Sequence, residues 1–239
     1  MKHVYGPIKS RRLGLSLGLS LSADKICDLD CIYCQWGSVG KTILERKPYV
    51  QADEIIQELK VWLQKHPQEA QELKFVTISG LGEPTLNTCI GELIDQVRKI
   101  TGLKIAVITN STLLGDPAVR SSLMEVDLIV PSLDAVDSEI FKRIDRPHAD
   151  IKLNEIIDGL VALRKEFSGQ IWLEVMFIAG VNDDFSHVEQ LKKVIQRIKP
   201  DKIQINSPVR STAKENVFPV DQVKLKKIKE ILGDRAEII

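Results

Sequence analysis

The sequence predicts a single α/β domain with parallel strands, because short apolar or β-branched segments alternate with longer segments of helical periodicity. No repeat, low-complexity linker or Pro/Gly-rich hinge divides the 239 residues, so we expect one domain over residues 1–239. Right-handed βαβ units imply a parallel sheet that is either open or curled toward a barrel. In both cases ligands are expected at the carboxyl ends of the strands, where the connecting loops meet.

Each expected element has its own local signal. Alternating or β-branched runs predict six strands, over residues 13–21, 74–79, 104–109, 127–132, 171–178 and 202–206. Helical periodicity predicts helices over residues 52–66, 87–99, 152–167 and 185–199, and Pro200 ends the last of them. Residues 224–229 are expected on the exposed side of an amphipathic helix. Because the strands are expected to be parallel, the segments that follow the first five of them should lie at one rim of the sheet.

The charge balance identifies no partner. The chain has 33 Lys and Arg residues and 33 Asp and Glu residues, so its net charge is zero. Hydrophobic residues make up 44% of it, as in ordinary globular proteins. A neutral total weakens the case for RNA binding but leaves room for a local basic patch. No segment has the length of a membrane span, and residues 1–12 do not begin a signal peptide, so we expect a cytoplasmic protein.

Three of the four cysteines, Cys27, Cys31 and Cys34, lie within eight positions, which suits metal binding rather than a disulfide framework. Iron–sulfur clusters normally take four thiolates, so three thiolates leave one iron free to bind a substrate or cofactor. One alternative is a zinc site completed by Cys89 or a histidine, but a second Cys-x2-Cys pair is missing. Another is a helix that carries three cysteines by chance. Cys89 is expected to be a small buried residue.

The Cys-x3-Cys-x2-Cys pattern, with Tyr33 directly before the last cysteine, resembles the radical S-adenosylmethionine (SAM) superfamily. The resemblance covers about residues 10–208, leaves residues 209–239 as a C-terminal tail element, and implies a partial (β/α)6 barrel with parallel strands. Residues 10–14, 31–35 and 79–86 more narrowly resemble an Fe-S oxidoreductase group related to tRNA wyosine-synthesis enzymes. The implied cofactors are SAM and a four-iron, four-sulfur (4Fe-4S) cluster, with Cys27, Cys31 and Cys34 as its ligands.

The same resemblance assigns SAM contacts to residues that follow successive strands. Tyr33 would contact the adenine. A glycine-rich motif that receives the methionine amino group is matched by Gly80, Gly82 and Glu83, although Leu81 separates the two glycines. Further contacts are implied for Asn110, Ser132 and Asp134, and for residues 178–182 beside the adenine. Taken alone, the glycine-rich segment could be an ordinary turn, and the polar residues at 132 and 134 a helix N-cap.

Several other residues have less definite expectations. Arg11 and Arg12 are expected as a solvated surface pair, with contact to an anionic substrate as the alternative. Trp36, beside the cysteines, is expected to pack. A second polar group, expected on a solvated face or alternatively toward the substrate, comprises Arg143, Arg146 and His148.

The activity implied by the resemblance is reductive cleavage of SAM to a 5′-deoxyadenosyl radical that abstracts hydrogen from an unidentified substrate. An external one-electron donor of the flavodoxin or ferredoxin type would supply the electron. The substrate would be a small molecule, an RNA nucleoside or a partner protein. Two alternatives remain open: a glycyl-radical-enzyme activating enzyme that acts on a partner protein, and a zinc-stabilised nucleic-acid-binding module.

Overall fold

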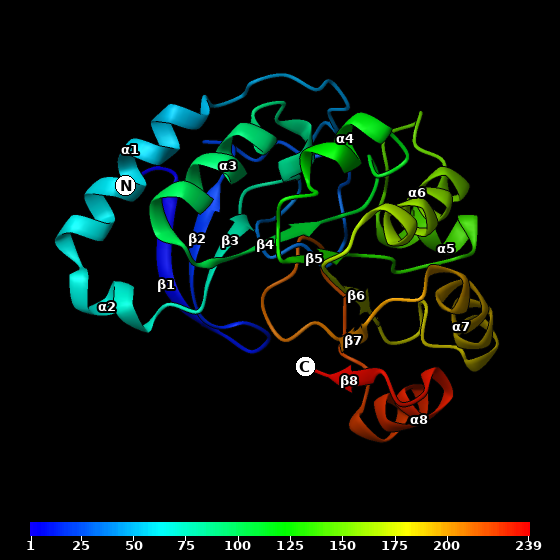
Figure 1. Ribbon diagram of the computed structural model, residues 1–239. Coiled ribbons are helices and arrows are strands. Elements are labelled where there is room, and N and C mark those ends of the chain that lie inside the picture. The colour runs from blue at the N-terminus through cyan, green and yellow to red at the C-terminus, as the bar shows by residue number, and fades with distance from the viewer.

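The computed structural model describes residues 1–239 and contains one curved eight-stranded sheet (Figure 1). The strands follow one another in chain order from β1 at one edge to β8 at the other. β1 is antiparallel to β2, and every later pair is parallel. The strands are β1 (Val4–Ser10), β2 (Gly14–Ser20), β3 (Phe75–Ser79), β4 (Lys104–Thr109), β5 (Leu128–Pro131), β6 (Gln170–Met176), β7 (Lys202–Asn206) and β8 (Ala236–Ile238).

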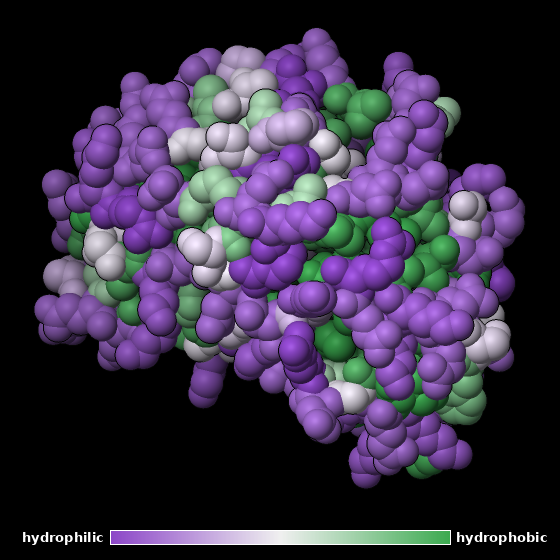
Figure 2. Space-filling view, turned by 45° about the vertical axis from the view of Figure 1, so that its right-hand side comes forward, coloured by the Kyte–Doolittle hydropathy of each residue, from purple (hydrophilic) through white to green (hydrophobic).

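Helices cover the outer face of this sheet (Figure 1). They are α1 (Ala52–Lys65), α2 (Pro67–Glu72), α3 (Ile90–Thr101), α4 (Pro117–Ser122), α5 (Ser138–Ile144), α6 (Leu153–Glu166), α7 (Phe185–Ile198) and α8 (Gln222–Leu232), with a 3-10 turn, η1, at Pro84–Leu86. None of the helices has the length and apolar character needed to cross a bilayer. Hydrophilic side chains cover most of the face in Figure 2, and hydrophobic ones are visible between them.

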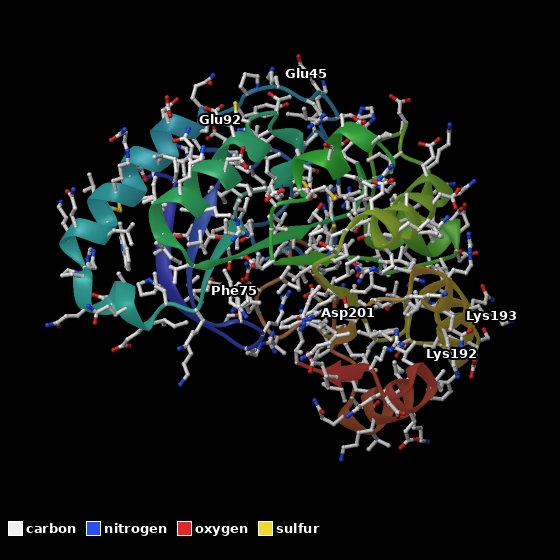
Figure 3. The ribbon with its side chains drawn as sticks, in the orientation of Figure 1. Glu45, Phe75, Glu92, Lys192, Lys193 and Asp201 are labelled. Carbon is white, nitrogen blue, oxygen red and sulfur yellow. The ribbon has the colours of Figure 1, made fainter.

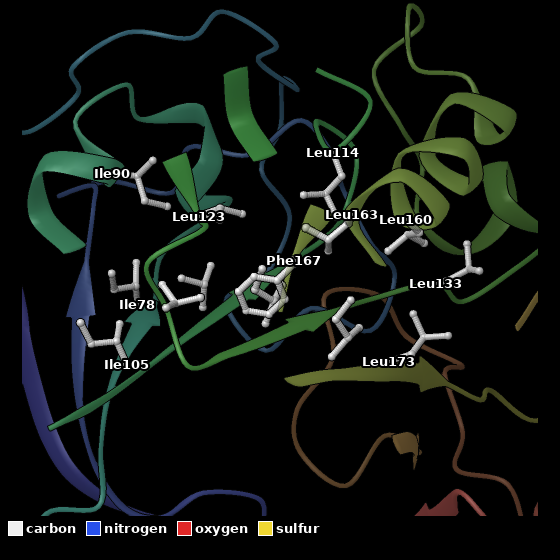
Figure 4. Packing of buried hydrophobic residues seen from close by; sticks show 14 of the residues in the cluster. Ile78, Ile90, Ile105, Leu114, Leu123, Leu133, Leu160, Leu163, Phe167 and Leu173 are labelled. Atoms are coloured by element: carbon white, nitrogen blue, oxygen red, sulfur yellow. The ribbon is translucent and has the colours of Figure 1, made fainter. Parts of the chain in front are cut away.

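The main core lies between the sheet and its helices. Alternate strand residues such as Ile78, Ile105 and Leu173 point outward and are fully buried against the helices (Figure 4). Helix residues such as Ile90 and Leu160 pack onto them in the same cluster of 49 buried residues. This packing fixes the strands and therefore fixes the loops that leave their carboxyl ends.

The structure confirms the parallel α/β class and the six predicted strands, with shifts of a few residues at their ends. It adds β1, which forms an antiparallel edge, and β8, which extends the parallel sheet beyond β7. Residues 209–239, expected as a C-terminal tail element, include α8 and β8, which continue the strand–helix pattern. The open edges at β1 and β8 make the architecture a partial barrel.

The hairpin turn between β1 and β2 carries the two adjacent arginines, and the prediction of a solvated pair is wrong for Arg12. The Arg12 guanidinium forms an ion pair with Glu174 of β6, and the two side chains are only 19% and 11% exposed. Arg11 stays exposed and donates from Nη1 to the carbonyl oxygen of Ile239 at 2.9 Å. Arg12 therefore connects the β1–β2 hairpin to β6, and Arg11 connects it to the residue that follows β8.

Replacing Arg12 by alanine is expected to lower the free energy of unfolding by about 2 to 3 kcal/mol, because it leaves the Glu174 carboxylate buried without its cation. Urea unfolding followed by circular dichroism measures the change. Arg11→Ala is the matched control, since its exposed guanidinium contributes little, on the order of 0.5 kcal/mol. Equal losses in the two variants would contradict a specific role for the buried pair.

Candidate active site

The loops at the carboxyl ends of β2 to β5 converge on one rim of the sheet. In Figure 3, Glu45, from the segment after β2, lies at the top of the view, above Phe75 at the start of β3. The contacts within this rim are specific: Ile26 pairs with Gly82, and Asn110 contacts Cys27. The loops predicted from the sequence to form the site, after β2, β3 and β4, therefore lie together at this rim.

Cys27, Cys31 and Cys34 lie on the irregular segment that follows β2, and all three are half-buried. Cys27 and Cys31 pack against the main core. Burial raises the pKa of both thiols, and the carboxylates of Asp28 and Asp145 raise the pKa of Cys27 and of Cys31, respectively, further. No group of three His, Cys, Asp or Glu side chains is arranged to hold a single metal ion. Three thiols on one loop suit the softer, larger iron–sulfur cluster.

Gly82 allows the cysteine segment to dock on the loop after β3. It has a φ of +105°, and a Cβ atom built there would lie 1.7 Å from the carbonyl oxygen of Ile26. The same oxygen accepts from the backbone N–H of Glu83 at 2.9 Å. Gly80 has a φ of +112°, with Ser20 Oγ 2.7 Å from the position of an added Cβ. Both glycines are therefore required by conformation and by close approach.

Glu83 is buried, and its carboxylate has four protein donors. Oε1 accepts from Thr85 N at 3.0 Å, from Thr85 Oγ1 at 2.6 Å and from Thr109 Oγ1 at 2.6 Å. Oε2 accepts from Asn110 N at 2.7 Å. Burial, followed by the charge of Asp28, raises the pKa of Glu83 to about 7. In this arrangement Glu83 joins the ends of β3 and β4.

Asn110, at the end of β4, is held between the cysteine segment and its own strand. Its Nδ2 donates to Asp28 Oδ1 at 2.6 Å and lies 3.8 Å from Cys27 Sγ. Asp28 Oδ2 also accepts from Thr112 Oγ1. Burial raises the pKa of Asp28, whose side chain is fully enclosed. The amide of Asn110 is thereby fixed beside the first cysteine.

Tyr33 and Asp134 meet above the end of β5. The phenol of Tyr33 donates to Asp134 Oδ2, and Asp134 Oδ1 accepts from the Met176 backbone N–H at 2.8 Å. Burial raises the pKa of Asp134 to about 6. A cavity of about 20 Å³ is lined by these two side chains together with Asn110 and Ser132. Four of the residues predicted to contact SAM are therefore brought together around one small space, and Gly80, Gly82 and Glu83 lie outside it.

Asp145 was missed by sequence reasoning, although it is part of this centre. It ends α5, it is buried, and its Oδ1 lies 3.4 Å from Cys31 Sγ. Burial and then the charge of Asp134 raise its pKa. No local motif marks Asp145, because 114 positions separate it from Cys31.

Residues 28–32 pair with residues 144–148 as a short two-stranded ribbon, called here the cysteine ribbon. Leu29 pairs with Pro147 in antiparallel fashion. The backbone N–H of Asp30 donates to the Asp145 carbonyl at 3.0 Å, and that of Ile32 donates to the Ile144 carbonyl at 2.9 Å. The segment after α5 therefore supports the cysteine segment directly.

Three other expectations have structural outcomes. Cys89, expected to be a small buried residue, occupies the N-cap position of α3 and is partly buried against the main core. The expectation that Trp36 packs is wrong, because its side chain is 52% exposed. In the segment over residues 178–182, Asn182 is fully buried and donates to the carbonyls of Asp134 and Met176 at 2.8 Å each.

The rim is rich in buried acids. Four carboxyl groups lie near Cys27 and Cys31, and burial raises the pKa of each: Asp28, Glu83, Asp134 and Asp145. Buried acids are stabilised by nearby positive charge. The centre is therefore suited to a ligand with cationic groups, such as an ammonium or a sulfonium, next to a thiolate-bound metal.

The chain resembles proteins of known family. The family model described as Radical SAM superfamily matches residues 24–195. A protein named GTPase Obg from Brachyspira hyodysenteriae is 37% identical over 229 residues, which cover 96% of this chain and 33% of that protein. A UPF0026 protein from Methanocaldococcus jannaschii is 30% identical over 239 residues, covering 100% of this chain and 73% of that protein. The chain thus spans a third of the first relative and most of the second.

Solved structures share the fold. Streptococcus suis SuiB bound to S-adenosylmethionine superposes with a TM-score of 0.68 at 16% identity, over 93% of this chain and 49% of that one. Archaeal TYW1 superposes with a TM-score of 0.58 at 21% identity, over 92% of this chain and 72% of that one. The partial barrel therefore follows the architecture of these proteins.

Proposed function

The chain belongs to the radical SAM superfamily, and we propose that Cys27, Cys31 and Cys34 hold a 4Fe-4S cluster with which it cleaves SAM reductively. When bound, the cluster and SAM supply a one-electron cleavage that yields methionine and a 5′-deoxyadenosyl radical able to abstract a substrate hydrogen. The observation that carries this proposal is the placement of three thiols on the loop after β2, beside the polar ends of β3 to β5.

The residues around the small cavity are proposed to orient SAM. Tyr33 is fixed by Asp134, so its ring is available to the adenine at a defined angle. Ser132 and Asn110 line the same cavity and offer a hydroxyl and an amide to the ribose and methionine parts. Gly80 and Gly82 are proposed to expose backbone carbonyls to the methionine ammonium.

Glu83 is proposed to act differently from the expectation of a direct ammonium contact. Its two oxygens already accept four hydrogen bonds from Thr85, Thr109 and Asn110. A carboxylate with this many donors holds the loops after β3 and β4 in register. We therefore assign Glu83 to positioning of these two loops.

Members of this superfamily are enzymes, so the zinc-stabilised nucleic-acid-binding module is not retained. We propose that an external one-electron donor of the flavodoxin or ferredoxin type reduces the cluster. The substrate, whether a small molecule, an RNA nucleoside or a partner protein, is not fixed by the fold.

Anaerobic reconstitution with iron and sulfide tests this proposal. We expect about four irons per chain, and formation of 5′-deoxyadenosine when SAM and dithionite are added together, measured by liquid chromatography with mass spectrometry. Omitting either reagent is the control and should give no product. A folded protein that carries the cluster but leaves SAM intact would refute the proposed activity.

A further inference from the structure

A pocket of about 690 Å³ lies beside the cysteine ribbon, outside the centre described above. Asp30, Gly40 and Thr42 from the cysteine segment form one part of its wall, and residues between Ser138 and Asn154 form the rest. This volume is within the range of sites for small molecules. We propose that this ribbon pocket binds the phosphate group of a phosphorylated small molecule.

The charges that line the ribbon pocket favour an anion. Lys142, Arg146 and Lys152 contribute three cations, His148 adds an imidazole, and Asp30 is the one acid in the wall. The three cationic side chains are 65%, 42% and 69% exposed, so they are accessible to a ligand. The residues that line the pocket therefore carry a net positive charge, although the whole chain is neutral.

The Asp30 carboxylate offsets one of these cations, Arg146, through Oδ2, while its Oδ1 is occupied within the cysteine segment. Its side chain is only 8% exposed. Oδ1 accepts from Ser38 Oγ and from the Val39 backbone N–H, both at 2.7 Å. Arg146 approaches Oδ2 at 3.3 Å, which holds the guanidinium at the wall of the pocket. A guanidinium in this position can bind phosphate oxygens in bidentate fashion.

The two lysines have acidic partners that a phosphate can replace. Lys142 pairs with Glu139 at 2.8 Å, and Lys152 pairs with Glu155 at 3.1 Å, each three residues apart on an exposed surface. Exposed pairs of this kind contribute little to stability. A phosphate with two negative charges can therefore recruit both ammonium groups into the pocket.

Backbone donors reinforce the cationic side chains. The first two residues of α6, Leu153 and Asn154, line the pocket, and no side chain caps this helix. The first N–H groups of a helix have no partner within it and favour negative charge. The wall thus combines cationic side chains with free backbone donors on one concave surface, as a phosphate site requires.

Residues that line the ribbon pocket lie on both strands of the cysteine ribbon, next in sequence to Cys31 and to Asp145. Asp30 directly precedes Cys31, and Arg146 directly follows Asp145, whose carboxyl contacts Cys31 Sγ. A ligand that binds Arg146 is therefore placed next to the segment that positions the second cysteine. Because the surface is a concave pocket, we infer a small phosphorylated molecule and not the flat face of a partner protein.

Isothermal titration of the reconstituted protein with inorganic pyrophosphate at low ionic strength tests this inference. We expect saturable binding of one pyrophosphate, weakened at least tenfold in the double variant Lys142→Glu/Lys152→Glu. The matched control is Lys226→Glu/Lys227→Glu on α8, which makes the same charge change at two exposed lysines away from the pocket. Absence of binding to the native protein, or equal weakening in both double variants, would overturn the proposal.

Arg146→Asn is a second, milder variant. Arg146 has a φ of +47°, and asparagine tolerates this conformation, so the guanidinium is lost while the backbone is kept. We expect at least fivefold weaker pyrophosphate binding, measured on protein whose iron content and folding are determined in parallel. Unchanged binding would exclude the guanidinium from the site.

A fluorescent single-stranded RNA of mixed sequence separates two sources of the phosphate. If pyrophosphate binds and the RNA does not compete with it, the site takes a free phosphorylated molecule, as we expect. If the RNA binds the native protein, is displaced by pyrophosphate and is lost in the pocket variant alone, the phosphate belongs to RNA. Neither result depends on SAM cleavage, so the ribbon pocket and the proposed activity can fail separately.

Discussion

Cys31→Ala is expected to lose the cluster and to form no 5′-deoxyadenosine, a drop of at least about a hundredfold, because removing one of three thiolates leaves two irons of the cube without protein ligands. Cys31 is the middle ligand of the segment, it packs against the core, and it contacts Asp145. Iron and sulfide analysis, the visible absorption of the cluster and the SAM cleavage assay measure the loss together.

Cys89→Ala is the matched control, since it removes the fourth cysteine of the chain. Cys89 lies at the start of α3, with its Sγ 3.8 Å from Gln51 Oε1. We expect native iron content and native SAM cleavage in this variant. Loss of the cluster from Cys89→Ala, or its retention in Cys31→Ala, would contradict the assignment of ligands. Far-UV circular dichroism confirms that both variants are folded.

Six of the strands were predictable from the sequence. Each is a short apolar segment, and the adjacent segments have helical periodicity or turn residues instead. β1 and β8 were not. β1 contains Gly6 and Pro7, which weaken a strand signal, and β8 has only three residues. Both strands depend on pairing with a neighbour, β1 with β2 and β8 with β7. Edge strands of this kind are stabilised by tertiary contacts that local patterns do not contain.

The same division applies to the active centre. The three cysteines and the Gly80–Glu83 segment carry local spacing, so the sequence alone indicated them. Asp145 and the Arg12–Glu174 pair depend on contacts between residues more than 100 positions apart. Arg12 looked like a surface residue for this reason, because nothing near it in the sequence indicates that Glu174 is buried on a distant strand. For Glu83, a sequence motif identified the residue, but its hydrogen-bond partners could be found only in the structure.

Gly82→Ala is expected to disrupt the junction between the cysteine segment and the loop after β3. A methyl group at this position would lie 1.7 Å from the carbonyl oxygen of Ile26, which is backbone and cannot rotate away. Positive φ adds strain of about 1 to 3 kcal/mol, and the collision adds about as much, so we expect the free energy of unfolding to fall by about 4 kcal/mol. The cysteine segment should also separate from Glu83 N–H, with loss of most of the iron.

Gly102→Ala separates conformational strain from collision, because Gly102 also has a positive φ of 61° but has no atom within 4 Å of an added Cβ. We expect it to cost about 1 kcal/mol and to keep the cluster. Urea unfolding and iron content distinguish the two variants. If Gly82→Ala is no less stable than Gly102→Ala and retains its iron, the cysteine segment does not depend on close approach at Gly82. The collision at Ile26 would then have to be relieved by a shift of the whole loop, and the docking of the two loops would not be what positions the cysteines.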